Sequence, residues 1–240
     1  MKFKIVIFVT LFSLLTTIAF ATPDDDLFSS VKHGYLTGAK EALAKGANIN
    51  AKDRDGLTAL MFACARNNLE MVKFLISKGA DVNAKNKYCE TSLFIATHKG
   101  FFEVVKLLIE KGADVNVKQK DGLTALIIAS YKGFEKIVKI LLEKGSNVNA
   151  KNNYGLTALM ISAELGHIAV VKLLISKGVD IEAKTNKGYN SLMFASRHCC
   201  VEIVKLLITK GANVNVKSND GSTVLMHASL GGNIEIVKLL

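Results

Sequence analysis

Residues 53–85 read DRDGLTALMFACARNNLEMVKFLISKGADVNAK. The apolar run Leu60–Cys64 predicts a short helix, whose small residues let a neighbouring backbone come close. Asn67-Asn68 ends that helix, and Leu69–Ser77 predicts a second one with apolar side chains at helical spacing. Gly79 then supplies the left-handed C-terminal cap that other residues adopt only at a cost. The unit is therefore a pair of short helices followed by an extended arm.

The same unit recurs every 33 residues along the chain. One grid position holds threonine, with Asn190 filling its missing place, and leucine follows two residues later. A third position is always glycine. These positions are Thr58, Thr91, Thr124, Thr157 and Thr223; Leu60, Leu93, Leu126, Leu159, Leu192 and Leu225; and Gly46, Gly79, Gly112, Gly145, Gly178 and Gly211. One helix pair cannot bury its own apolar face, but stacked pairs can bury each other. The period therefore predicts an elongated all-α array with short arms on one edge.

At the level of residues the unit closely resembles the ankyrin repeat. The resemblance lies in the period, in the Gly-Leu-Thr-Ala-Leu starts at Gly56, Gly122 and Gly155, and in the Gly-Ala-Asp-Val-Asn arms at Gly79 and Gly112. It implies an ankyrin-repeat solenoid of helix-turn-helix units with short β-hairpin-like arms. It also implies a protein whose work is to bind other proteins.

The grid divides the whole chain. We expect a signal peptide (1–21), an N-terminal capping half repeat (22–52), repeat 1 (53–85), repeat 2 (86–118), repeat 3 (119–151), repeat 4 (152–184), repeat 5 (185–217) and a truncated repeat 6 (218–240). The last repeat stops before its glycine, which indicates either a truncated sequence or an end that docks on something else.

The first residues have the features of an export signal. Lys2 and Lys4 precede an apolar run, Ile5–Ala21, and Ala19-Phe20-Ala21 offers a small-x-small cleavage site. The run is at the short limit for a membrane span, so cleavage is favoured over an uncleaved anchor. We expect an exported protein, in the periplasm or outside the cell, without a membrane span after cleavage. The Lys-, Asn- and Ile-rich composition is typical of a bacterial protein.

The chain is basic, with a formal net charge of +10 that falls to about +8 without the signal. Three grid positions account for 19 of its 31 basic residues. The three lysine series are Lys40, Lys73, Lys106, Lys139, Lys172, Lys205 and Lys238; Lys45, Lys78, Lys111, Lys144, Lys177 and Lys210; and Lys52, Lys85, Lys118, Lys151, Lys184 and Lys217. They form either a solvated face or a basic stripe for an anionic partner. No aromatic residues alternate with them as in single-strand binders, so we expect no nucleic-acid partner.

Candidate binding residues follow from the family resemblance, which implies that partners contact the arm tips and the exposed face of the first helix. The non-periodic residues at these positions are Arg54, Leu57, Arg66, Tyr88, His98, Lys99, Leu123, Tyr131, Lys132, Tyr154, Leu156, Leu165, Tyr189 and Arg197. Tyrosine and arginine anchor interfaces more often than their abundance predicts. The set holds four of the five tyrosines, none on a predicted core position, and we expect three leucines, Leu57, Leu123 and Leu156, to be exposed beside them. The alternative is that tyrosine is simply tolerated in surface loops.

Cysteine chemistry is a weak indication here. Cys64 falls on a small, buried helix position, and Cys89 and Cys199 lie three repeats apart, about 30 Å, too far for a disulfide. Cys199 and Cys200 are either free or joined to each other. Cys89 replaces a turn glycine and Cys199-Cys200 replaces the family's usual Gly-His, so we expect local distortion in repeats 2 and 5.

Catalytic, cofactor and metal motifs are not recognisable. The five histidines are scattered, and every glycine has a turn or capping position on the grid rather than a phosphate loop. His198-Cys199-Cys200 is too tightly spaced to surround one metal ion. The sequence therefore predicts a non-enzymatic, monomeric scaffold that binds another protein. Alternatives are an accessory or inhibitor of an exported enzyme, and a secreted effector directed at a host.

Overall fold

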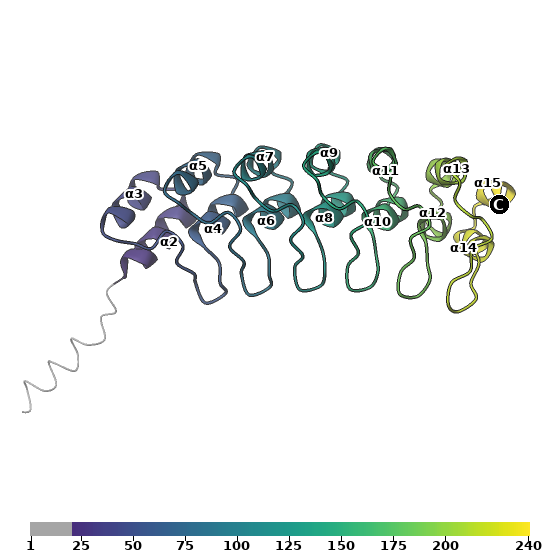
Figure 1. The fold of residues 1–240 in the computed structure, drawn as a ribbon, viewed down its shortest axis with the longest axis horizontal. Helices are drawn as coiled ribbons and strands as arrows, with labels where there is room; N and C mark the ends of the chain where they lie inside the picture. The colour runs from purple at the N-terminus through teal and green to yellow at the C-terminus, as the bar shows by residue number, and fades with distance from the viewer. Residues whose placement is uncertain (1–20) are drawn as a thin grey trace, which may run out of the picture.

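Helices follow one another in pairs in the computed structural model, which describes residues 21–240 (Figure 1). Their bounds are α2 Pro23–His33, α3 Leu36–Ala44, α4 Ala59–Ala65, α5 Leu69–Ser77, α6 Ser92–Lys99, α7 Phe102–Glu110, α8 Ala125–Lys132, α9 Glu135–Glu143, α10 Ala158–Glu164, α11 Ile168–Ser176, α12 Ser191–Arg197, α13 Val201–Thr209, α14 Val224–Gly231 and α15 Ile234–Leu239. The pairs stand side by side in one row, which confirms the predicted all-α repeat array. Apart from Ala21, the predicted signal peptide lies outside the described residues.

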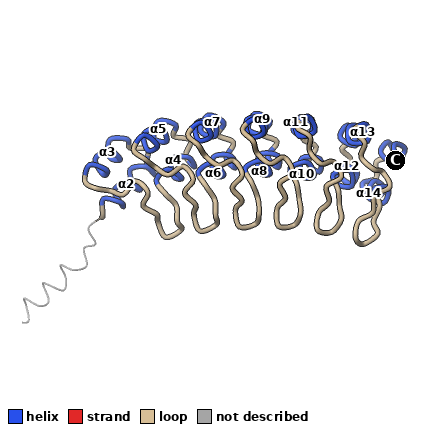
Figure 2. Tube along the Cα trace, viewed as in Figure 1, coloured by secondary structure: helices blue, strands red, loops and turns tan. Residues whose placement is uncertain are grey.

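Two rows of helices and one row of arms make up the array. The even-numbered helices form the inner row, next to the arms, and the odd-numbered helices form the outer row (Figure 1). The array bends into a shallow arch with the arms on its inner side. The arms are loops (Figure 2), and the described residues contain only two isolated bridges, Lys151 to Thr157 and Lys217 to Thr223. The arms therefore follow the path of a β-hairpin, but they do not form paired β-strands.

The threonine grid has a structural explanation in helix capping. The Thr124 hydroxyl accepts a hydrogen bond from the Ile127 backbone N–H at 3.3 Å, at the start of α8. Each of the other grid threonines makes the same bond, and Asn190 makes it through its side-chain oxygen at 3.1 Å. A cap of this kind stabilises a helix by about 1 kcal/mol. The grid residue therefore sets where each inner helix begins.

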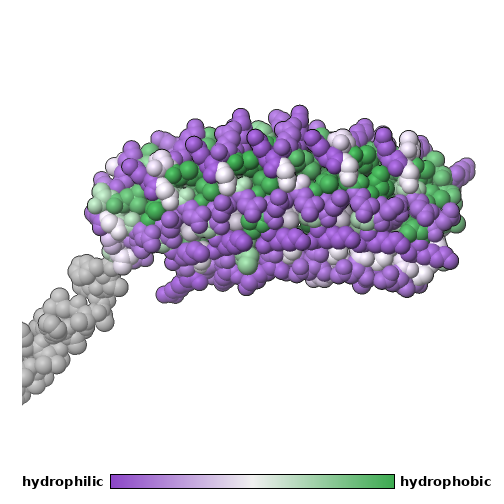
Figure 3. Space-filling model, in the orientation of Figure 1, coloured by the Kyte–Doolittle hydropathy of each residue, from purple (hydrophilic) through white to green (hydrophobic). Residues whose placement is uncertain are grey.

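Burial along the array shows that each repeat is covered by the next one. The grid leucines Leu60, Leu93, Leu126, Leu159 and Leu192 are at most 1% exposed, but Leu225, at the same position of the last repeat, is 48% exposed. Leu230 and Ile234 in that repeat are also exposed. In Figure 3, hydrophobic residues show in the band over the helix pairs, and the arm edge is mostly hydrophilic. The apolar face of one pair is thus buried only when a following pair stands against it.

Backbone hydrogen bonds join each arm to the next. The Asn153 N–H donates to the Asp121 carbonyl at 3.0 Å, and the Asn186 N–H donates to the Tyr154 carbonyl at 3.1 Å. Glycine makes this approach possible. Gly155 has a φ of +78°, and a Cβ there would lie 2.7 Å from the Asn186 nitrogen. The arms therefore form one continuous row of hydrogen-bonded loops.

The distortion expected in repeats 2 and 5 is not found in the backbone. Cys89 keeps the left-handed conformation of the glycine it replaces, with a φ of 62°, and its N–H donates to the Asn86 carbonyl at 3.0 Å. Cys199 likewise has a φ of 60°. A residue with a Cβ in this conformation costs about 1–2 kcal/mol. Both repeats therefore keep the regular geometry and carry local strain.

Candidate protein-binding surface

The predicted site residues lie along two lines on the array. Arg54, Tyr88 and Tyr154 come from the arms, and Leu57, Leu123, Leu156 and Tyr189 lie where an arm returns to its helix. The other members lie at or just after the last turn of an inner helix: Arg66, His98, Lys99, Tyr131, Lys132, Leu165 and Arg197. One inner-helix length separates the two lines. The candidate surface is therefore a band across the inner row, bordered by arms and by helix ends.

Most of the predicted surface is accessible. Tyr88 is 49% exposed, Tyr131 50% and Tyr154 70%. The charged and polar members and Leu165 are exposed as well: Arg54, Arg66, His98, Lys99, Lys132 and Arg197. The arms and inner helices thus present three large aromatic side chains to solvent. Their role in binding remains a prediction.

Four predicted members are more buried than expected. Leu57, Leu123 and Leu156 are half-buried, so the expectation of exposed leucines is wrong. Tyr189 is half-buried too and packs against the core, although no core position was predicted for it. Each of the four directly precedes a helix N-cap, where an apolar side chain packs on the first turn of the helix. The Tyr189 and Phe194 rings show this packing, with their centroids 6.2 Å apart.

Two of the three lysine series have local structural positions. The second series stands at the C-terminal cap of the outer helices, as Lys111 does on α7, where a cation interacts favourably with the helix dipole. In four of the six lysines of the third series the ammonium group donates to a carbonyl of the next repeat, as Lys52 does to Lys85 at 2.9 Å and Lys151 to Lys184 at 2.9 Å. This leaves mainly the first series, on the outer helices, as candidates for a basic stripe.

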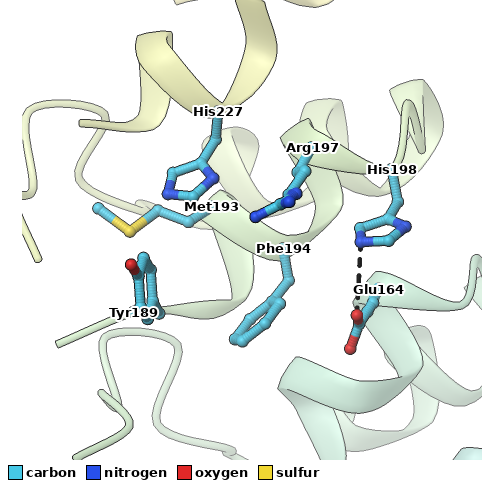
Figure 4. A pocket seen from close by; sticks show the side chains of 7 residues that line it. All are labelled: Glu164, Tyr189, Met193, Phe194, Arg197, His198 and His227. Atoms are coloured by element: carbon cyan, nitrogen blue, oxygen red, sulfur yellow. Dashed lines mark ion pairs between the residues drawn. The ribbon is translucent and has the colours of Figure 1, made fainter. Parts of the chain in front are cut away.

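A hollow opens at the end of this band, between repeats 4 and 6. It has a volume of about 380 Å³ and is lined by Glu164, Tyr189, Met193, Phe194, Arg197, His198 and His227 (Figure 4). The sequence-based set contains two of these residues, Tyr189 and Arg197. The others include His227. The only feature of the sequence that distinguishes this position is a histidine where the earlier repeats have Phe or Ile.

The charged groups of the hollow differ in whether they are paired. His198 Nε2 lies 3.4 Å from Glu164 Oε1, drawn as the dashed line in Figure 4. The Tyr189 hydroxyl donates to Asp220 Oδ2 at 2.7 Å. Hydrogen bonds from Ser218 and Tyr189 hold the pKa of Asp220 below its usual value. Arg197 makes no ion pair within residues 21–240.

His227 is the unusual polar residue of the site. It is 6% exposed, and neither ring nitrogen has a hydrogen-bond partner in the described part of the chain. Its ring meets the Tyr189 ring edge-on, with centroids 5.4 Å apart. Burial lowers the pKa of His227, the nearby Arg197 lowers it further, and Asp220 opposes them. The ring is therefore neutral at pH 7, with one donor and one acceptor nitrogen.

The four cysteines are free thiols. Cys64 is 0% exposed, which confirms its predicted core position, and burial raises its pKa to about 12. The Cys199 thiol is exposed and lies 3.0 Å from the Gly231 carbonyl. Within residues 21–240 no three His, Cys, Asp or Glu side chains cluster in a way that could hold a metal ion.

The burial of these thiols predicts their order of reaction. In the folded protein at pH 8, a maleimide is expected to modify Cys199 rapidly and to leave Cys64 unmodified, because Cys64 is both inaccessible and protonated. Mass spectrometry of peptides from a labelling time course would measure this. The same labelling in denaturant is the control, in which Cys64 reacts too. Rapid modification of Cys64 in the folded protein would contradict its position in the core.

No helix within residues 21–240 combines the length and the apolar character that a bilayer span requires.

The search of curated proteins gives no significant match. A family model described as Ankyrin repeats (3 copies) matches residues 27–119, 114–185 and 179–240. Ankyrin repeats generally mediate protein–protein interaction, and proteins built from them are typically non-catalytic scaffolds. With the family pattern matched over this length and the helix pairs stacked in one row, the chain belongs to the ankyrin-repeat family.

Proposed function

We propose that this protein is a non-catalytic scaffold that binds a partner protein on the inner side of its arch, outside the cytoplasm. The observation that carries the proposal is the set of exposed tyrosines, Tyr88, Tyr131 and Tyr154, on consecutive repeats. A tyrosine ring gains a large contact area at little cost in conformational entropy, so tyrosines in such a set make good interface anchors.

The connected arms support the same function. Because each arm is bonded to the next, the surface is formed before a partner arrives, and little ordering cost is left to be met on binding. The bonds Lys120 N–H to the Tyr88 carbonyl and Asn186 N–H to the Tyr154 carbonyl, at 3.0 and 3.1 Å, hold the two arm tyrosines themselves.

The location outside the cytoplasm rests on the sequence of residues 1–21. A positive start, an apolar run and a small-x-small motif favour export with cleavage. A partner in the cell envelope would make the protein an accessory or inhibitor of an exported enzyme, whereas a partner in host cytoplasm would make it an effector. The compartment in which the partner is found distinguishes these roles.

Substitution of two tyrosines tests the proposed surface. In the double variant Tyr131→Ala, Tyr154→Ala we expect the affinity for the native partner to fall at least about tenfold, because buried tyrosine anchors often contribute about 2 kcal/mol each. Crosslinking and pull-down from periplasmic and secreted fractions would identify the partner, and titration of the purified pair would give the affinity.

The matched control removes two exposed lysines from the C-terminal caps of the outer helices α9 and α11 in the same repeats, Lys144→Ala and Lys177→Ala. It is expected to leave binding unchanged. If both double variants fold and bind the partner as well as the unmodified protein, the tyrosine surface is not the binding site.

A further inference from the structure

His227 breaks a regular feature of the inner helices. The residue four positions after each helix cap is apolar in the five preceding repeats: Phe62, Ile95, Ile128, Ile161 and Phe194. His227 holds this position in repeat 6, and it is 6% exposed with both ring nitrogens unpartnered. A buried polar group without a partner costs about 1–3 kcal/mol, so a native structure needs a reason to keep one.

The surroundings of His227 show which kind of group is missing. In Figure 4 its ring points from α14 into the hollow, near Tyr189 and Met193, and the Arg197 side chain reaches the hollow from α12. The carboxylates nearby are already engaged, Glu164 by His198 and Asp220 by Tyr189. The unused hydrogen-bonding capacity therefore includes the donors of Arg197 and one N–H of His227. Donors of this kind bind an anionic oxygen.

Apart from the Glu164–His198 pair, the other side chains that line the hollow are largely apolar. The rings of Tyr189 and Phe194 line one side, and Met193, which is 1% exposed, lies between them and the His227 ring (Figure 4). The volume of about 380 Å³ falls within the range of ordinary binding pockets, roughly 300–1,000 Å³. A group that fits these walls therefore carries an anionic oxygen beside an apolar surface.

We propose that this hollow binds an acidic segment of the partner protein, with an Asp or Glu carboxylate between Arg197 and His227 and the next apolar side chain against Tyr189 and Phe194. The inference rests on the proposed function and adds the chemistry of the partner at one point. Two observations favour an acidic segment of a protein over a small anion. The hollow, at about 380 Å³, is larger than a small anion would fill, and the chain carries a large positive net charge that attracts an acidic partner.

A pair of capped peptides tests the proposal directly. The probe is acetyl-Ala-Glu-Phe-Ala-amide and its partner in the comparison is the same peptide with Gln in place of Glu. Titrated into the purified protein and followed by NMR, the Glu peptide is expected to shift the His227 ring and Arg197 side-chain signals and to bind at least about tenfold more tightly than the Gln peptide. Charge-assisted hydrogen bonds of about 1.5–3 kcal/mol correspond to such a ratio.

Two variants and one control locate the effect. Arg197→Gln and His227→Phe are each expected to reduce Glu-peptide binding to about that of the Gln peptide. His227→Phe restores the residue type that Phe62 and Phe194 hold at this position, so the variant is expected to fold. Lys45→Gln, an exposed position at the C-terminal cap of α3 at the far end of the array, is expected to change nothing.

Three results would overturn the proposal. The first is equal affinity for the two peptides. The second is Glu-peptide binding that is unchanged in both the Arg197→Gln and the His227→Phe variants. The third is displacement of the Glu peptide by sodium acetate at the same concentration, which would mean that a small anion is sufficient. None of these results would contradict the proposal that the exposed tyrosines bind the partner. That proposal is tested separately, with the native partner and the Tyr131→Ala, Tyr154→Ala variant. Conversely, a failure of the tyrosine test leaves the peptide preference to be measured independently.

Discussion

Replacing Leu126 with alanine is expected to lower the free energy of unfolding by about 2–5 kcal/mol. Leu126 lies in α8, in the middle of the array, and is 1% exposed. Its side chain fills the space between neighbouring repeats, so its loss leaves a cavity that the surrounding helices close only in part. Because each repeat is stabilised by its neighbours, weaker packing between the central repeats also uncouples the unfolding of the two halves of the array.

Urea denaturation followed by circular dichroism would measure the loss, and a second unfolding transition would report the uncoupling. Leu225→Ala is the matched control, since Leu225 holds the same grid position but is 48% exposed. Its expected loss is about 1 kcal/mol or less, because an exposed side chain leaves little cavity. Equal losses from the two substitutions would mean that neighbouring repeats do not bury one another.

Gly155→Ala is expected to destabilise the protein by more than the left-handed conformation alone explains. Gly155 has a φ of +78°, and an added Cβ would lie 2.7 Å from both the nitrogen and the side-chain oxygen of Asn186. The conformation costs about 1–2 kcal/mol, and the collision would displace the neighbouring arm and its bond from the Asn186 N–H to the Tyr154 carbonyl. Loss of that bond adds about 1 kcal/mol.

Gly221→Ala separates the two contributions. Gly221 has a φ of +82°, but no atom lies within 4 Å of its added Cβ, so only the conformational cost is expected. Denaturation would give the difference between the two variants, and hydrogen exchange at the Asn186 amide would show whether the arm bond opens. Cys89→Gly is the converse change and is expected to stabilise the protein by about 1–2 kcal/mol, since it relieves a φ of 62°. Identical losses at Gly155 and Gly221 would show that the close arm contact is unimportant.

The repeat period was sufficient to predict the fold, because stacking follows directly from identical units with one apolar face. The expectation that Leu57, Leu123 and Leu156 are exposed is wrong, because the repeat pattern alone does not show that the grid threonine caps its helix. Once the cap is known, the preceding residue must pack on the first turn. The role of the third lysine series also depends on contacts between repeats, as in the bond from Lys52 to the Lys85 carbonyl.

The hollow at His227 was beyond sequence reasoning for a different reason. Its lining comes from three consecutive repeats, and the lack of a partner for the His227 ring is visible only when all neighbouring side chains are placed. The sequence does hold one indication, a histidine at a position that is apolar in five other repeats. Such departures from the grid are more informative about binding than the residues that obey it.

The even spacing of the inner row also limits what a partner chain can do there. Packed helices lie about 8–10 Å apart, and an extended peptide advances about 3.3 Å per residue. An extended segment that runs along the row of repeats, across the inner helices, would therefore reach a new repeat after about three residues. Side chains at every third position would then face equivalent places on successive units, and the residues between them would be left free to vary.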